Sequence, residues 1–144
     1  MPDPDVIDEI DRLYGLESAA LILRLSESAA YIKPQDTRDA MTLDHMAADQ
    51  REHLQWIADL LDTLDATPGP RRVNTLSADL HYNRIETLVP RLVDDERQLQ
   101  SHCEQIARLV VGEPRSADLC SRIAARHRAH VDQLEQIIAA YSSA

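Results

Sequence analysis

The sequence predicts an all-α fold, an up-down four-helix bundle with a long crossover between the second and third helices. Three observations carry this prediction. Good helix formers dominate the composition, whereas glycine occurs only three times and phenylalanine is absent. Apolar residues recur at helical spacing along four long segments. Prolines stand mainly between these segments, where they separate one helix from the next.

The bulk composition is that of a globular protein with a substantial core. Hydrophobic residues make up 44% of the chain and charged residues 28%. A length of 144 residues predicts one domain, spanning residues 1–144. The net charge of −10 argues against nucleic acid as a partner, because neutralising phosphates requires a basic face, and it equally disfavours an anionic membrane surface.

The sequence also favours a cytoplasmic protein of bacterial type. Its first residues, MPDPDVIDEIDRL, are acidic, unlike a secretory or transit peptide. The apolar runs are shorter than the roughly 20 residues that a transmembrane helix needs. Cys103 and Cys120 are too few for a disulfide scaffold, so we expect them to be buried thiols.

The first helix is expected from about Pro4 to Ile32, with Asp3 as its N-cap. The second is expected from about Gln35 to Asp65. In both helices, the residues that recur about once per turn on the buried face are apolar, apart from a few polar positions considered below.

The third helix is expected from near Asn83, which has capping-box spacing to Glu86, to a stop at Gly112. Pro90 falls inside it and predicts a tolerated bend. The fourth is expected from Arg115 or Ser116 to Tyr141.

Connection lengths predict the topology. The turns at 33–36 and 112–115 are short, so helices one and two, and helices three and four, should be antiparallel. The segment 66–82 is long enough to run from one end of the bundle to the other. A further helical turn is expected near 77–81.

Six polar side chains interrupt the apolar registers of these helices. Two are single glutamates and four form i, i+3 pairs: Glu17, Glu96, Gln50 with His53, and His127 with His130. A glutamate from each of two helices and a Glu-x-x-His pair from each of the other two form the inward-facing set of a carboxylate-bridged metal bundle. Burying such a set costs several kcal/mol unless its members are paired or bind a metal.

The chain resembles the ferritin-like superfamily, of the rubrerythrin and bacterioferritin kind. Asp49-Gln50-Arg51-Glu52-His53 is similar to that superfamily's second-helix motif, and His127-Arg128-Ala129-His130 to its fourth-helix motif. Glu17 with Arg24, and Glu96 with Cys103, are similar to the first- and third-helix patterns, in which tyrosine is common where Arg24 and Cys103 stand here. The resemblance covers nearly the whole chain and implies a two-metal site.

Two replacements reduce what the resemblance implies. Gln50 and His127 stand where the superfamily has glutamates, so the formal ligand charge falls from −4 to −2. That charge balances one divalent ion. Imidazoles with one or two carboxylates suit iron(II) or zinc, and also cobalt, nickel or copper, rather than calcium or magnesium. We therefore expect one transition-metal ion per chain, with ligands Glu17, His53, Glu96 and His130, joined by His127 and, less favourably, Gln50.

Arg24 complicates this expectation. On an unbroken helix it lies about 10.5 Å from Glu17 on nearly the same face. It could then pair with Glu17 or Glu96, making either a poorer ligand, or reach solvent at the bundle end.

Three functional readings stay open. The first is a bundle that binds a single metal ion. The second is a metal-free bundle acting as a structural or interaction module, which could associate as a homodimer. The third, a di-iron oxidase or peroxidase, ranks last because two bridging carboxylates are missing. Catalytic residues cannot be assigned from the sequence.

Overall fold

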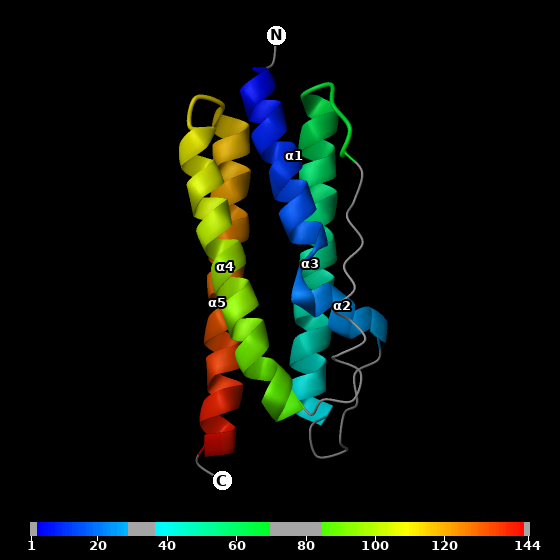
Figure 1. Ribbon diagram of the computed structural model, residues 1–144, viewed down its shortest axis with the longest axis vertical. Coiled ribbons are helices and arrows are strands. Elements are labelled where there is room, and N and C mark those ends of the chain that lie inside the picture. The colour runs from blue at the N-terminus through cyan, green and yellow to red at the C-terminus, as the bar shows by residue number, and fades with distance from the viewer. Residues whose placement is uncertain (1–2, 29–36, 70–84, 143–144) are drawn as a thin grey trace.

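The computed structural model describes residues 3–28, 37–69 and 85–142, and these residues form an elongated helical bundle (Figure 1). Its helices are α1 (Pro4–Ser18), α2 (Leu21–Ser28), α3 (Thr37–Thr63), α4 (Ile85–Leu109) and α5 (Pro114–Ser142). The described residues contain no strand. Among the described helices, none is both long and apolar enough to cross a membrane.

The helix directions confirm the predicted crossover topology. In Figure 1, α1 and α5 run down the bundle, whereas α3 and α4 both run up it. The chain therefore leaves α3 at one end and enters α4 at the other. The connecting residues 70–84, with the expected cap at Asn83 and the extra turn near 77–81, lie outside the described part of the chain.

Side-chain and backbone caps define the helix ends. The Asp3 carboxylate accepts a hydrogen bond from the backbone N–H of Asp5 at 2.9 Å, as expected for the N-cap of α1. Glu113 performs this role for α5, since its Oε2 accepts from the Ser116 N–H at 2.7 Å. Pro114 is therefore the first residue of α5, one position earlier than predicted.

The prediction of one continuous first helix is wrong. The helix breaks at residues 19–20, and α2 leaves at an angle to α1 (Figure 1). The Leu21 N–H donates to Asp95 Oδ2 of α4 at 2.9 Å instead of continuing the α1 ladder. Ser18 Oγ donates to the Tyr14 carbonyl at 2.7 Å, a local bond that competes with helix continuation.

The predicted end of α4 also differs. The helix ends at Leu109, and no described glycine, Gly112 included, adopts positive φ, so Gly112 is not a left-handed helix stop. Pro90 is tolerated on an exposed position inside α4, which leans away from α5 over its first turns (Figure 1).

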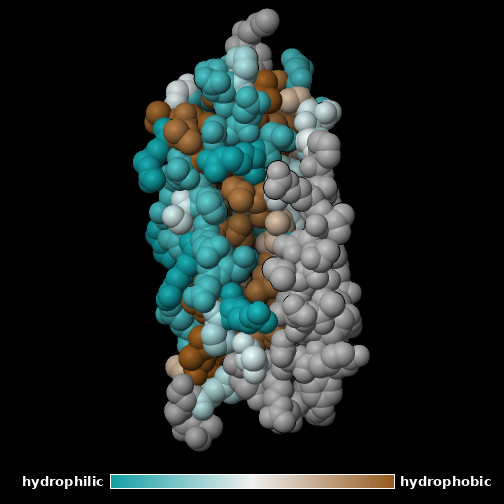
Figure 2. Space-filling view, in the orientation of Figure 1, coloured by the Kyte–Doolittle hydropathy of each residue, from teal (hydrophilic) through white to brown (hydrophobic). Residues whose placement is uncertain are grey.

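The bundle interior consists of two apolar clusters separated along its length. One cluster combines α1 with the C-terminal half of α3, the C-terminal part of α4 and the N-terminal part of α5, including Ile10, Leu61, Ile106 and Ile123. The other combines α2 with the opposite halves of these helices, including Ile22, Met46, Leu92 and Leu134. On the face shown in Figure 2, the described surface is mainly hydrophilic with small hydrophobic patches.

Candidate metal centre

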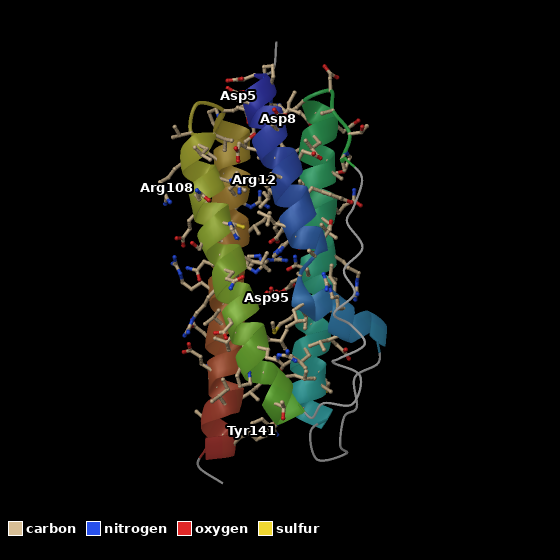
Figure 3. The ribbon with its side chains drawn as sticks, in the orientation of Figure 1. Asp5, Asp8, Arg12, Asp95, Arg108 and Tyr141 are labelled. Atoms are coloured by element: carbon tan, nitrogen blue, oxygen red, sulfur yellow. The ribbon has the colours of Figure 1, made fainter. Side chains whose placement is uncertain are left out.

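A layer of buried polar side chains lies between the two apolar clusters. All six predicted positions belong to it, and each is at most 2% exposed: Glu17, Gln50, His53, Glu96, His127 and His130. Figure 3 shows nitrogen- and oxygen-bearing side chains between the helices at the height of Asp95, the residue of α4 next to Glu96. The six polar positions that interrupt the predicted apolar registers are therefore all buried at one level of the bundle.

Helix geometry brings these side chains together. The pairs Gln50/His53 on α3 and His127/His130 on α5 are three residues apart, so both members of each pair point to the same face of their helix. Glu96 lies near the middle of α4, whereas Glu17 is the penultimate residue of α1.

Glu17 accepts hydrogen bonds from two histidines. His53 Nδ1 lies 2.9 Å from Glu17 Oε1. His127 Nε2 lies 2.8 Å from Glu17 Oε2 and 3.0 Å from Oε1. One carboxylate thus joins the histidines of α3 and α5.

Glu96 occupies the other side of His127. Its Oε1 lies 3.1 Å from His127 Nδ1 and 2.6 Å from His130 Nδ1. The remaining nitrogen of His130, Nε2, lies 2.9 Å from Asp49 Oδ2. His127 therefore stands between the two buried glutamates, each of which approaches a different ring nitrogen.

The ion pairs in this layer shift the pKa values strongly. Burial acts to raise the pKa of Glu17, but the charges and hydrogen bonds of His127 and His53 outweigh it and lower that pKa to about 2. Burial acts to lower the pKa of His127, but Glu17, together with hydrogen bonds to Cys103 and Glu96, raises it to about 12. Without a metal, these contacts therefore favour the imidazolium form of His127, which lies between two carboxylates.

The same logic applies at Glu96 and His130. Burial opposes the charged form of each group. At Glu96 it is outweighed by the hydrogen bonds and charges of His127 and His130, and at His130 by the hydrogen bond and charge of Glu96. The pKa of Glu96 is lowered and that of His130 is raised. Asp49 adds to the shift at His130.

Two sets of buried ligand atoms are close enough to share an ion. One comprises Glu96, His127 and His130, and the other comprises Glu17, Cys103 and His127, with the ligand atoms of each set within 4.8 Å of one another. Three buried atoms of the layer have no hydrogen-bond partner among the described residues: His53 Nε2, Glu96 Oε2 and Gln50 Oε1. Such atoms are costly to bury, so the Glu, His and Cys groupings of this layer fit a metal ion.

Gln50 has a role that a glutamate could not perform. Its Nε2 donates a hydrogen bond to the Glu17 backbone carbonyl at 2.9 Å. The Ala20 N–H reaches the same carbonyl at 3.3 Å. The amide thereby fixes the end of α1, and with it the backbone of Glu17.

Because the first helix is broken, Arg24 does not lie at the position expected along one continuous helix. Arg24 belongs to α2, is 8% exposed, and donates from Nη2 to the Ala19 carbonyl at 3.1 Å. Within the described residues, the side-chain hydrogen bonds of Glu17 and Glu96 go to histidines. The distance expected along one continuous helix therefore does not apply.

Three residues near the layer were not predicted to contribute. Asp49 contacts His130, Cys103 joins a ligand set, and Asp95 caps α2. Cys103 could have been found, because it falls in the buried register seven residues after Glu96. Asp49 and Asp95 precede in-register residues by one position and gave no such signal.

Comparison with known proteins identifies the fold. No protein-family model and no curated protein sequence matches this chain. Among solved structures, it is similar to the bacterioferritin-related protein of Bacteroides fragilis, described as a dodecameric thioferritin. The TM-score is 0.79 at 18% identity, over 97% of this chain and 88% of that one.

A second similar structure is a ferritin-like, diiron-carboxylate protein of Bacillus anthracis. The TM-score is 0.75 at 12% identity, over 94% of this chain and 96% of that one. The bundle therefore has the ferritin-like fold.

Proposed function

We propose that this ferritin-like bundle binds one divalent transition-metal ion per chain within its buried polar layer. The observation that carries the proposal is the layer itself: fully buried glutamates and histidines, with His53 Nε2 and Glu96 Oε2 unpaired among the described residues. A cation supplies the partner that such atoms need, because leaving a buried polar group unsatisfied costs about 1–3 kcal/mol.

The chemistry of the donors favours iron or zinc. Glu17 and Glu96 carry two negative charges, which balance one divalent ion. Three imidazoles favour a borderline transition metal over magnesium or calcium. Ligands are drawn from Glu17, His53, Glu96, His127 and His130. Gln50, already bonded to a backbone carbonyl, supports the site in this proposal.

A metal-free structural module is the second candidate. It is favoured by the hydrogen bonds between His127 and both glutamates. Protons held in these bonds can neutralise the carboxylate charge of the layer in place of a metal ion. Such a module could associate as a homodimer.

A di-iron oxidase has weaker support. The similar Bacillus anthracis protein is described as a diiron-carboxylate protein. In this chain, however, only two of the six corresponding side chains are carboxylates.

For either metal-binding candidate, the proposed location is the cytoplasm.

Metal titration tests the leading proposal. Calorimetry with zinc or anaerobic iron(II) should give about one ion per chain, and His53→Gln should weaken binding. His45→Gln is the matched control, because His45 is an exposed histidine of the same helix. Unchanged binding in both variants would contradict the proposal.

Thermal unfolding provides an independent readout. Binding to the folded state alone should stabilise the protein by about 2.7 kcal/mol when the free ion is about a hundredfold above Kd. The melting temperature should fall on chelation. If verified metal removal leaves it unchanged, the structural module is the better description.

A further inference from the structure

We infer that Cys103 is a ligand of the proposed ion, which is therefore held by a mixed carboxylate, thiolate and imidazole set and is thiophilic. This inference rests on the proposed function and adds both the position of the ion and its chemical class. The ion lies on the Glu17 side of His127, with Glu17, Cys103 and His127 as ligands.

Cys103 meets the geometric requirement for a ligand. Its sulfur, a Glu17 carboxylate oxygen and a His127 ring nitrogen all lie within 4.8 Å of one another, and all three side chains are fully buried. Glu17 approaches His127 at Nε2, so this nitrogen faces the ligand set. Three elements, α1, α4 and α5, each contribute one donor.

The hydrogen bonds of the histidines favour the Glu17 side of His127, although Glu96 Oε2 on the other side also has no partner among the described residues. On the Glu96 side, both ring nitrogens of His130 already face carboxylates, at 2.6 Å to Glu96 and 2.9 Å to Asp49. Asp49 is in turn held by Arg126, with Nη1 at 3.3 Å from Oδ1.

On the Glu17 side, a histidine nitrogen is uncommitted. His53 is bonded to Glu17 through Nδ1, and its buried Nε2 has no partner within the described part of the chain. Its ring centroid lies 5.2 Å from that of His127. His53 belongs to neither ligand set as the side chains stand, and it is the candidate fourth ligand once its ring rotates to turn Nε2 towards the ion.

Charge and ligand type define the class of ion. One carboxylate and one thiolate carry two negative charges, which neutralise a divalent cation without help from Glu96. Thiolate with imidazole selects zinc, cobalt(II) or another thiophilic ion over magnesium, calcium and manganese. Coordination forms one sulfur–metal and one nitrogen–metal bond, and it releases the thiol proton of Cys103 and the Nε2 proton of His127 to solvent, with no change in oxidation state.

Cobalt(II) absorption provides the test, since a cobalt–thiolate bond gives a near-ultraviolet charge-transfer band that imidazole and carboxylate ligands do not give. The full chain would be titrated with cobalt(II) under anaerobic, reducing conditions, as wild type, Cys103→Ser and Cys120→Ser. Cys120 is a matched control, being a buried cysteine that belongs to neither ligand set found among the described residues.

We expect the band in wild type and in Cys120→Ser, and its loss in Cys103→Ser. If cobalt(II) binds to wild type without the band, or if Cys120→Ser removes it, the assignment of Cys103 is overturned while the proposed function stands. If wild type binds no cobalt(II), both are overturned. Should Cys103→Ser fail to fold, the band in Cys120→Ser still decides, because Cys103 is then the only cysteine.

Discussion

Two side chains of the buried layer, Gln50 and His127, lack the charge of a glutamate but make hydrogen bonds that a glutamate could not make. Gln50 differs from a glutamate by one amide group, yet this group donates to the carbonyl that ends α1. His127 differs from a glutamate in having two nitrogens, each of which faces a different carboxylate. Compared with glutamates at these positions, both side chains therefore carry less negative charge and make internal hydrogen bonds instead.

Gln50→Glu should destabilise the metal-free protein. The substitution removes a buried donor and places a carboxylate oxygen against the Glu17 carbonyl, at an expected cost of about 1–3 kcal/mol. Urea unfolding in a chelator measures this cost. Gln98→Glu, at an exposed position of α4, is the control and should change stability by less than about 0.5 kcal/mol. Equal stability of the two variants would show that the Gln50 bond contributes little.

Metal-free stability should depend on pH in a defined direction. Glu17 has a lowered pKa, so its contribution is present above 4.5 and is lost as the pH falls towards about 2. His127 has a raised pKa, so its contribution is present below 6.5 and is lost as the pH rises towards about 12. Stability from this pair should therefore be greatest between 4.5 and 6.5.

Urea unfolding of chelated protein at several pH values tests this dependence. Above 6.5, the folded state retains a proton that unfolded His127 releases, so stability should fall by up to about 1.4 kcal/mol per pH unit for this group. His127→Gln should flatten the alkaline side of the profile. If stability falls equally steeply with pH in the variant, a group other than His127 causes the alkaline loss of stability.

At the scale of the elements, helix ends are fixed by contacts that periodicity does not encode. Asp95 caps α2 from α4, across 74 residues of sequence. The end of α3, by contrast, is fixed by a local contact, in which the Ala66 N–H donates to the Leu61 carbonyl at 2.8 Å. The backbone of Asp65 is strained there, because it adopts φ 59°. This is the pattern of a left-handed helix stop, a position that glycine prefers.

Asp95→Ala should loosen α2. It removes the acceptor of the Leu21 N–H and should cost about 1 kcal/mol, whereas Asp95→Asn keeps an acceptor and should cost less. Amide hydrogen exchange at the start of α2 should accelerate in the alanine variant. Asp94→Ala, exposed on α4, serves as the control. Unaltered exchange after Asp95→Ala would mean that α2 is positioned by packing alone.

Asp65→Gly should stabilise the protein by about 0.5–1 kcal/mol. The exposed backbone at this position is left-handed, which glycine adopts without the steric cost of a Cβ. Chemical denaturation measures the gain. Asp65→Ala retains the Cβ and should show no gain, so equal stability of the glycine and alanine variants would exclude backbone strain as the cause.

At the scale of the whole molecule, the polar layer divides the bundle into two apolar cores. Ile123 belongs to one core and Leu134 to the other, although both lie on α5. Eleven residues of helix separate them by about 16 Å. Each core is completed by its own halves of the remaining helices.

The two cores should respond independently to substitution. Ile123→Ala and Leu134→Ala should each cost about 2–5 kcal/mol, because both side chains are fully buried. In the double variant, the costs should add to within about 0.5 kcal/mol. A coupling well above that value would show that the polar layer transmits packing changes from one core to the other.

The helical repeats and the polar positions on their buried faces were predictable from the sequence, whereas the break between α1 and α2 was not. Helical periodicity predicted α3 and α5 and the buried layer because burial on one face leaves a regular trace in the sequence. It missed the α1–α2 break because Asp95 and Gln50, which hold that break, are distant in sequence. It also missed Asp49, because a half-exposed carboxylate has no periodic signature.

The early end of α1 changes the electric field in the bundle interior. The C-terminus of a helix carries a macrodipole charge of about −0.5, and in an unbroken helix reaching Ser28 it would lie about 15 Å farther along. Here that negative end lies beside Glu17, while the Asp95 carboxylate meets the opposing positive end of α2. The carbonyls at the end of α1 therefore add negative potential beside Glu17, in a layer where Gln50 and His127 carry no carboxylate.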